Sequence, residues 1–305
     1  MTFRCIPLCS CSKAAYIVST LGLIFVILFI PFLRNAVLQP VWPYAWREMG
    51  TLDVLALKFF TQNTLAVEPV SSCPVKTEPV VKPSDIDASK VRVYSEVKGA
   101  QLRTLEHTRF LPALTAIEKL QLLHTYLVMA EALRLMRVEY FFVQGSLLGV
   151  HRHGGIIPWD DDIDITINVT DWKLVRHGLS CIHGYVLAVT EYMHWKFYPV
   201  ETGYPFIDIF FFTENERFLW AVSSSTSLYL VFPKQDTYPL STGQYEGIYV
   251  PVPKNIDQIV KNRYDFDVCQ SRGMDHKTSL VYPWSSISKV PCSSLTYLYQ
   301  MYNLV

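Results

Sequence analysis

The sequence predicts an α/β domain with a small mixed sheet flanked by helices, placed behind an N-terminal transmembrane helix. After residue 105, segments with the apolar spacing of a helix alternate with short aromatic or β-branched runs, which is typical of α/β domains. Residues 14–33 contain no charged side chain, and roughly twenty apolar residues in a helix cross a bilayer core. These patterns together predict a membrane-anchored α/β protein.

The apolar run at the N-terminus has two interpretations. A cleaved signal peptide normally has a shorter run followed by small residues, whereas Arg34 and Asn35 follow here, so an uncleaved signal anchor is favoured. The short tail before it favours a single-pass type II orientation in the Golgi or endoplasmic reticulum membrane. We therefore expect four parts, with the last one lumenal: a cytosolic tail at 1–13, the anchor at 14–33, a stem and linker at 34–104, and a globular domain at 105–305.

Composition restricts the function and the cysteine chemistry. The formal net charge is zero and the isoelectric point is about 7.1, so no basic field indicates binding to nucleic acid. Residues 68–90 are rich in proline, serine and charge, which predicts an extended spacer. Cys73, Cys181, Cys269 and Cys292 would be lumenal and can pair in three ways; free buried thiols remain an alternative for Cys181 and Cys269.

Several elements of the domain can be expected from local patterns. Residues 115–138 have the spacing of a well-covered amphipathic helix, with Ile117 and Leu135 among its apolar positions. A short helix opens at Gly145-Ser146 and ends at Gly154-Gly155. The other expected elements are strands at 139–143, 163–167, 185–189 and 206–212 and a helix at 171–179. The region after 212 has no clear pattern.

Acidic residues cluster where a strand is expected to begin. Asp160, Asp162 and Asp164 alternate in the chain, so they would share one face of a strand while Ile163 and Ile165 point into the core. Carboxylates held together beside apolar residues repel each other, and Mg²⁺ or Mn²⁺ would remove that repulsion. A solvated turn is an alternative. An EF-hand is rejected because Ile165 stands where that loop requires glycine.

Other residues extend this hypothesis. Gly145 and Ser146 lie between an expected strand and a helix, where backbone N–H groups can bind phosphate; alternatively, Ser146 is an ordinary N-cap. Asp208 is the one acid in an apolar strand, so it either completes the metal ligands, acts as a general base or faces solvent at a sheet edge. A phosphate site beside a metal site predicts phosphoryl transfer.

These residues resemble the LicD family of phosphotransferases. The resemblance runs through FFVQGSLLGVHRHGGIIPWDDDIDI and FIDIF and returns in FPKQDTYPLSTGQYEGIYVPVPKN. It implies a nucleotidyltransferase-like fold and transfer of ribitol phosphate or phosphocholine from a CDP-linked donor to a glycan. It also implies metal binding by Asp162 and Asp164 with Asp160, help from Asp208 in the attack of the acceptor hydroxyl, and phosphate contacts from Arg152 and Lys234.

Two other functions fit parts of the pattern. A glycosyltransferase that uses a nucleotide-sugar shares the carboxylate–metal–diphosphate arrangement, and a catalytically idle, membrane-tethered glycan-binding protein could keep the same acids. The sequence leaves open the transferred group, the acceptor, the oligomeric state, the disulfide pairing and the glycosylation of Asn168, which begins the sequon Asn168-Val169-Thr170.

Overall fold

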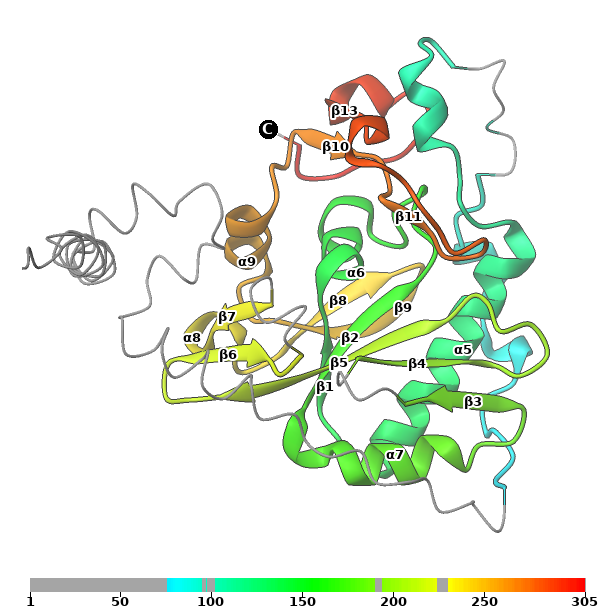
Figure 1. The fold of residues 1–305 in the computed structure, drawn as a ribbon, viewed down its shortest axis with the longest axis vertical. Helices are drawn as coiled ribbons and strands as arrows, with labels where there is room; N and C mark the ends of the chain where they lie inside the picture. The colour runs from blue at the N-terminus through cyan, green and yellow to red at the C-terminus, as the bar shows by residue number, and fades with distance from the viewer. Residues whose placement is uncertain (1–75, 95–96, 98–101, 190–193, 224–229, 305) are drawn as a thin grey trace, which may run out of the picture. The chain divides into compact units, whose positions relative to one another are not determined.

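The computed structural model describes residues 76–94, 97, 102–189, 194–223 and 230–304 (Figure 1). These residues fall in one compact unit, Phe60–Val305. The predicted cytosolic tail, the predicted anchor and the first part of the predicted stem lie outside the described residues. In the described parts of the chain, no helix combines the length and apolar character needed to cross a bilayer.

A mixed sheet forms the centre of this unit. Its strands follow the order β1-β2-β5-β4-β3, and β6 and β7 extend it from β5. Only the β2–β5 pair is parallel among the paired strands of this sheet, and the other pairs are antiparallel. The strands are β1 (Tyr140–Phe142), β2 (Ile163–Asn168), β3 (Tyr185–Ala188), β4 (His194–Pro199), β5 (Ile207–Glu214), β6 (Phe218–Ala221) and β7 (Val231–Pro233). The predicted mixed sheet is confirmed.

The two central strands are covered on both faces. Every residue of β2 is buried except Asn168, and β5 is buried until its last two residues. Such strands are normally continuous apolar runs. The buried acids Asp164 and Asp208 therefore depart from the expected pattern and mark the place to look for function.

Two helices pack near the sheet. The longer, α5 (Ala116–Leu135), begins with a capping box in which Thr115 and Glu118 bond each other's backbone N–H groups, and it packs against β4, β5 and α7 (Trp172–Ser180). Both helices were expected. Ile117 and Leu135, however, are 78% and 61% exposed, because they lie at the two ends of α5, away from its buried positions.

The expected short helix after β1 is also present. It consists of α6 (Gln144–Leu148) followed by a π-helical turn, Gly149–His153. Gly154 ends this turn with φ = 61°, a conformation that glycine adopts without strain.

The C-terminal region, which the sequence left without a pattern, folds as small elements around this core. β8 (Ser241–Tyr245) and β9 (Ile248–Val252) form a hairpin that contacts β1. The remaining elements are α8 (Lys234–Thr237), α9 (Ile256–Arg263), β10 (Val268–Gln270) paired with β13 (Lys289–Pro291), and β11 (Met274–Asp275) paired with β12 (Leu280–Val281). A disulfide joins Cys269 to Cys292, and Cys181 is also disulfide-bonded, so neither Cys181 nor Cys269 is the free thiol that was left open.

Short 3-10 turns also occur among the described residues. They are Pro83–Asp85, Ala88–Lys90, Glu106–Phe110, Val169–Asp171, Trp284–Ser286 and Cys292–Leu295.

Residues 76–94 of the predicted stem and linker, which include the described part of the predicted spacer, pack on the domain instead of extending away from it. Val91 is buried, Val81 and Ile86 pack against the core, and the backbone N–H of Arg92 donates to Glu246 at 2.8 Å. The compact unit therefore begins well before residue 105. A few apolar residues among the prolines and charges are enough to anchor this stretch.

Candidate active site

Three aspartates meet at one end of the two central strands. Asp164 on β2 and Asp208 on β5 are partners in the parallel register, so their side chains lie on the same face of neighbouring strands. Asp162 precedes β2 directly. Carboxylate oxygens of the three residues lie within 4.8 Å of one another, and all three side chains are buried.

The pKa values of these acids divide into two kinds. Burial, together with the charges of the neighbouring aspartates, raises the pKa of Asp162 and of Asp164 well above the usual range. Burial also acts to raise the pKa of Asp208, but hydrogen bonding to His194 and the charge of Lys196 outweigh it, and the pKa of Asp208 is lowered. Asp208 is therefore ionised where its two neighbours resist ionisation.

Asp162, Asp164 and Asp208 fit a divalent cation. Buried carboxylates that repel one another are stabilised when a cation lies between them, and hard ions such as Mg²⁺ and Mn²⁺ prefer oxygen ligands. The sequence predicted Asp160 as the third member of this set. In the structure Asp208 takes that place, because the parallel pairing of β2 with β5 brings it beside Asp164, whereas Asp160 lies outside the group.

Asp160 instead faces Gly145. A Cβ atom on Gly145 would lie 2.6 Å from Oδ2 of Asp160 and 3.7 Å from Oδ2 of Asp164, so only glycine lets these carboxylates approach the α6 backbone. Burial, and then the charge of Asp161, raises the pKa of Asp160 to about 6.

Ser146 holds the site together from the neighbouring helix. The N-cap of α6 is Val143, so the alternative in which Ser146 is an ordinary N-cap is wrong. Its buried hydroxyl oxygen accepts a hydrogen bond from the backbone N–H of Asp164 at 2.8 Å. Ser146 thus fixes the start of β2, which carries the acidic group.

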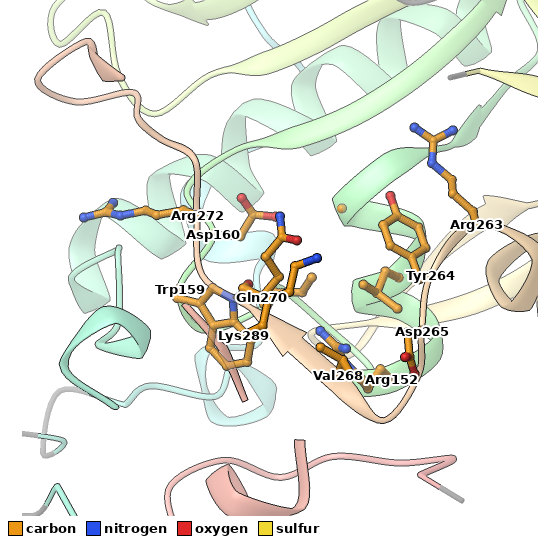
Figure 2. Close-up of a pocket in the computed structure, with 13 residues that line it drawn as sticks. Arg152, Trp159, Asp160, Arg263, Tyr264, Asp265, Val268, Gln270, Arg272 and Lys289 are labelled. Carbon is orange, nitrogen blue, oxygen red and sulfur yellow. Dashed lines mark hydrogen bonds between the residues drawn. The ribbon is translucent and has the colours of Figure 1, made fainter. Parts of the chain in front are cut away.

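A pocket of about 430 Å³ opens beside these residues (Figure 2). Asp160 and Gly145 line it near the acidic group, Trp159 and Tyr264 contribute aromatic surface, and Arg152 lies within its wall. A volume of this size is in the range of small-molecule sites. Its lining is completed by Leu148, Ile157, Arg263, Asp265, Val268, Gln270, Arg272 and Lys289.

The two cations that the sequence proposed as phosphate contacts lie in different places. Arg152 lines the pocket, so the structure brings it to the site. Lys234 pairs with Glu214 at 3.1 Å, at the opposite end of β5 from Asp208, roughly 20 Å along the strand at about 3.3 Å per residue. The structure does not bring Lys234 to the acidic group.

Sequence reasoning missed two basic residues next to Asp208. Lys196 is its partner in the β4–β5 register and donates from Nζ to Oδ1 at 2.7 Å, and His194 Nε2 lies 3.2 Å from Oδ2. The alternation of β4 could have placed both on one face, but only the register with β5 shows that this face meets Asp208.

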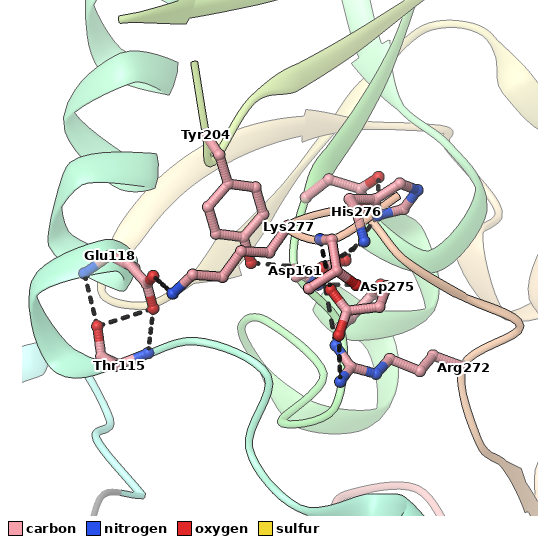
Figure 3. A network of polar contacts seen from close by, with 11 residues as sticks. Thr115, Glu118, Asp161, Tyr204, Arg272, Asp275, His276 and Lys277 are labelled. Atoms are coloured by element: carbon pink, nitrogen blue, oxygen red, sulfur yellow. Dashed lines mark hydrogen bonds and ion pairs between the residues drawn. The ribbon is translucent and has the colours of Figure 1, made fainter. Parts of the chain in front are cut away.

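His276 was also missed. Its Nδ1 lies 2.7 Å from Asp161 and 3.4 Å from Asp162, and Tyr204 donates to Asp161 at 3.3 Å (Figure 3). Burial acts to lower the pKa of His276, but the hydrogen bond that its ring donates to Asp161, and the charge of Asp161, outweigh burial, so the pKa is raised. The residues next to His276 in the sequence do not indicate a place in the site, because its acidic partners are more than a hundred positions away.

Comparisons with known proteins find similarity to parts of this chain. Residues 137–255 match the model of the LicD/FKTN/FKRP nucleotidyltransferase domain, and this range contains the three clustered aspartates. Two curated relatives, each named ribitol 5-phosphate transferase FKRP, from Mus musculus and Homo sapiens, are 56% identical over 34 residues, which is 11% of this chain and 7% of theirs.

A third relative, the uncharacterized protein RT0683 of Rickettsia typhi, is 31% identical over 129 residues. That match covers 40% of this chain and 38% of RT0683, so the chain spans well under half the length of these curated relatives.

Among solved structures, the lincosamide antibiotic adenylyltransferase LnuA bound to lincomycin is similar over 45% of this chain and 82% of its own, with 17% identity and a TM-score of 0.32. The family resemblance therefore rests on one part of the chain: residues 137–255 match the LicD/FKTN/FKRP nucleotidyltransferase domain.

Proposed function

We propose that this protein is a metal-dependent phosphotransferase that moves a phospho-alditol or phosphocholine group from a CDP-linked donor to a glycan acceptor. The observation that carries the proposal is the group of three buried carboxylates, Asp162, Asp164 and Asp208, within 4.8 Å of one another. These three carboxylates lie within the residues that match the LicD domain, and a pocket of nucleotide-compatible size lies beside them. The FKRP relatives, which are named ribitol 5-phosphate transferases, favour ribitol phosphate as the transferred group.

Each proposed residue has a defined part in the reaction. A divalent cation held by the three carboxylates would neutralise the negative charge of the donor diphosphate. Asp208, kept ionised by Lys196 and His194, accepts a hydrogen bond from the acceptor hydroxyl. As that oxygen forms a bond to the distal phosphorus, the bond to the CMP oxygen breaks, and the hydroxyl proton passes through Asp208 to water.

In this proposal, the apolar run near the N-terminus determines the membrane at which the protein acts. Residues 14–33 anchor the chain as a single-pass type II protein in the Golgi or endoplasmic reticulum membrane, with residues 105–305 in the lumen. The Cys269–Cys292 disulfide supports an oxidising compartment. Recovery of the full chain from cells in soluble form without detergent would contradict the anchor.

The first test combines metal binding with transfer. In the full chain, purified in detergent if required, Asp164→Asn and Asp208→Asn should each lower transfer from CDP-ribitol or CDP-choline by a hundredfold or more, because a metal ligand is lost. Asp257→Asn is the matched control, since Asp257 has a side chain that is 69% exposed. Isothermal titration calorimetry with Mn²⁺ should likewise show weaker metal binding by Asp164→Asn and Asp208→Asn than by the wild type and Asp257→Asn. Wild-type transfer activity in Asp164→Asn would overturn the proposed site.

The same assay separates the alternatives. A preference for UDP- or GDP-sugars would identify a glycosyltransferase. A folded protein that binds Mn²⁺ but turns over no nucleotide donor would be a glycan-binding protein without catalysis.

A further inference from the structure

The pocket beside the acidic group is lined by an excess of cations. Arg152, Arg263, Arg272 and Lys289 line it, against the acids Asp160 and Asp265. Arg263, Arg272 and Lys289 all follow residue 255, where the matched nucleotidyltransferase domain ends. The basic side of the pocket is therefore built largely by a C-terminal segment, residues 256–291, that follows the matched residues.

Arg152 is the buried member of this group. Its side chain is 97% buried, and its described hydrogen bonds run to His153 Nε2 at 3.1 Å and to Cys292 Sγ at 3.4 Å. Among the described residues, no carboxylate forms an ion pair with it. Burial lowers the pKa of Arg152 to about 10. A buried guanidinium that faces a pocket without a carboxylate partner can be stabilised by an anionic ligand.

The arginines from the C-terminal segment lie close to the acidic residues. Arg272 Nη1 is 3.7 Å from Oδ2 of Asp161, and Arg263 and Arg272 line the same pocket as Asp160. Figure 2 shows Arg263 and Arg272 on opposite sides of the view, with Asp160 between them. A ligand in this pocket therefore meets cations on either side of the Asp160 carboxylate, next to the acidic group.

Arg272 and His276 tie this segment to the acidic group. Arg272 pairs with Asp275 at 3.1 Å and with Asp161 at 3.7 Å, and His276 bonds Asp161 (Figure 3). Lys277, which follows them, pairs with Glu118 at the start of α5. Arg272 is thus held by protein carboxylates, whereas Lys289 on β13 lines the pocket with an exposed side chain.

We propose that Arg263 and Lys289 of this segment, together with Arg152, form an anion-binding wall that binds the two phosphates of a nucleoside diphosphate group, while Arg272 positions the wall. A metal on the carboxylates and the cations of the pocket can together neutralise a diphosphate, and Arg and Lys are suited to phosphate oxygens. The inference rests on the proposed function only for the identity of the donor.

Binding of simple diphosphates tests this wall without turnover. Isothermal titration of the full chain with inorganic diphosphate, CDP and CMP in the presence of Mg²⁺ should show that Arg263→Gln and Lys289→Gln each weaken binding of diphosphate and CDP by about tenfold or more, as expected for a charge-assisted hydrogen bond. Binding of CMP, which has one phosphate, should weaken less in the same variants. Lys261→Gln, on the same helix α9 with an exposed side chain, is the matched control and should bind like wild type.

Arg152 needs a gentler substitution because it is buried. Arg152→Lys keeps the charge but loses the planar pair of donors, so it should weaken diphosphate binding while its melting temperature shows that the fold is retained. Wild-type affinity for diphosphate in Arg263→Gln and Lys289→Gln, or no diphosphate binding by the wild type, would overturn the wall even if transfer is active. Weakened binding in both variants without transfer from any CDP donor would reject the proposed function and support the wall.

Discussion

Asp164 is the residue in which the conflict between folding and function is clearest. It is buried beside Asp162 and Asp208, and burial with the neighbouring charges raises its pKa well above the usual range. A folded state with a raised carboxyl pKa binds more protons than the unfolded state, so its stability falls as the pH rises through that interval. A cation on the carboxylates reverses this effect.

This effect can be measured with Asp164→Asn. In EDTA, the variant should melt at a higher temperature than the wild type at pH 7.5, and the difference should shrink toward pH 5, where Asp164 is increasingly protonated in the folded wild type. With Mg²⁺ at about a hundred times its dissociation constant, only the wild type should gain about 2.7 kcal/mol of stability. Thermal unfolding of the full chain across this pH range is the measurement.

Asp257→Asn serves again as the control for this prediction. Its difference from the wild type should not depend on Mg²⁺, because Asp257 lies on α9 outside the acidic group. An Asp164→Asn variant that is less stable than the wild type in EDTA at pH 7.5 would contradict a repulsive acidic group.

Within single elements, the helix after β1 shows how two glycines serve different purposes. A Cβ atom on Gly149 would lie 2.5 Å from the backbone oxygen of Gly155, which cannot move without distorting the turn that ends at His153. A Cβ atom on Gly145 would meet the end of the Asp160 side chain, which can rotate away. Alanine at position 149 should therefore lower the stability of the fold, whereas alanine at position 145 should disturb the site.

We expect Gly149→Ala to lower the free energy of unfolding by about 1–3 kcal/mol, as overpacking does in a filled core. Gly145→Ala should leave the melting temperature nearly unchanged but weaken binding of CDP with Mg²⁺, because the displaced Asp160 carboxylate enters the pocket. Gly273→Ala is the control, since its Cβ would have only Ile287 within 4 Å, at 3.8 Å. Thermal melts and calorimetry distinguish these outcomes, and equal loss of stability in both variants would contradict this reasoning.

Across the whole molecule, long-range ties hold the C-terminal segment against the domain. The Cys269–Cys292 disulfide closes a loop of 23 residues beside β10 and β13, and Arg152 donates to Cys292 Sγ. In addition, Glu246 pairs with Lys119 at 2.7 Å and accepts a hydrogen bond from the backbone N–H of Arg92, which secures the N-terminal stretch.

Replacing both Cys269 and Cys292 with alanine should lower the free energy of unfolding by about 3 kcal/mol, the amount expected when a loop of this length is released. The same variant should bind diphosphate more weakly, since Lys289 lies on β13. Chemical denaturation of the full chain measures the first effect. Glu131→Gln, which removes an exposed ion pair with Arg134, should cost less than about 1 kcal/mol; a similar cost in the cysteine variant would contradict this assignment.

The sequence by itself determined the local elements and the main acids. Periodicity placed α5, α7 and most strands of the sheet, and the alternation of acids with isoleucines identified Asp162 and Asp164, because these patterns depend on neighbours within a few positions. It also singled out Asp208 as the one acid in an apolar strand, but left open whether it is a metal ligand, a general base or a solvent-facing residue. Asp160 was assigned to the metal site because a continuous strand was assumed, whereas β2 begins at Ile163.

Only the tertiary structure decided which of these residues meet. Parallel pairing of β2 with β5 sets Asp208 beside Asp164, and the β4–β5 register adds Lys196, although these residues lie far apart in the chain. His276 and the cations of the pocket come from a C-terminal segment without a periodic pattern. Strand register and loop packing depend on the burial of whole faces, so no local stretch of sequence contains the information that brings the site together.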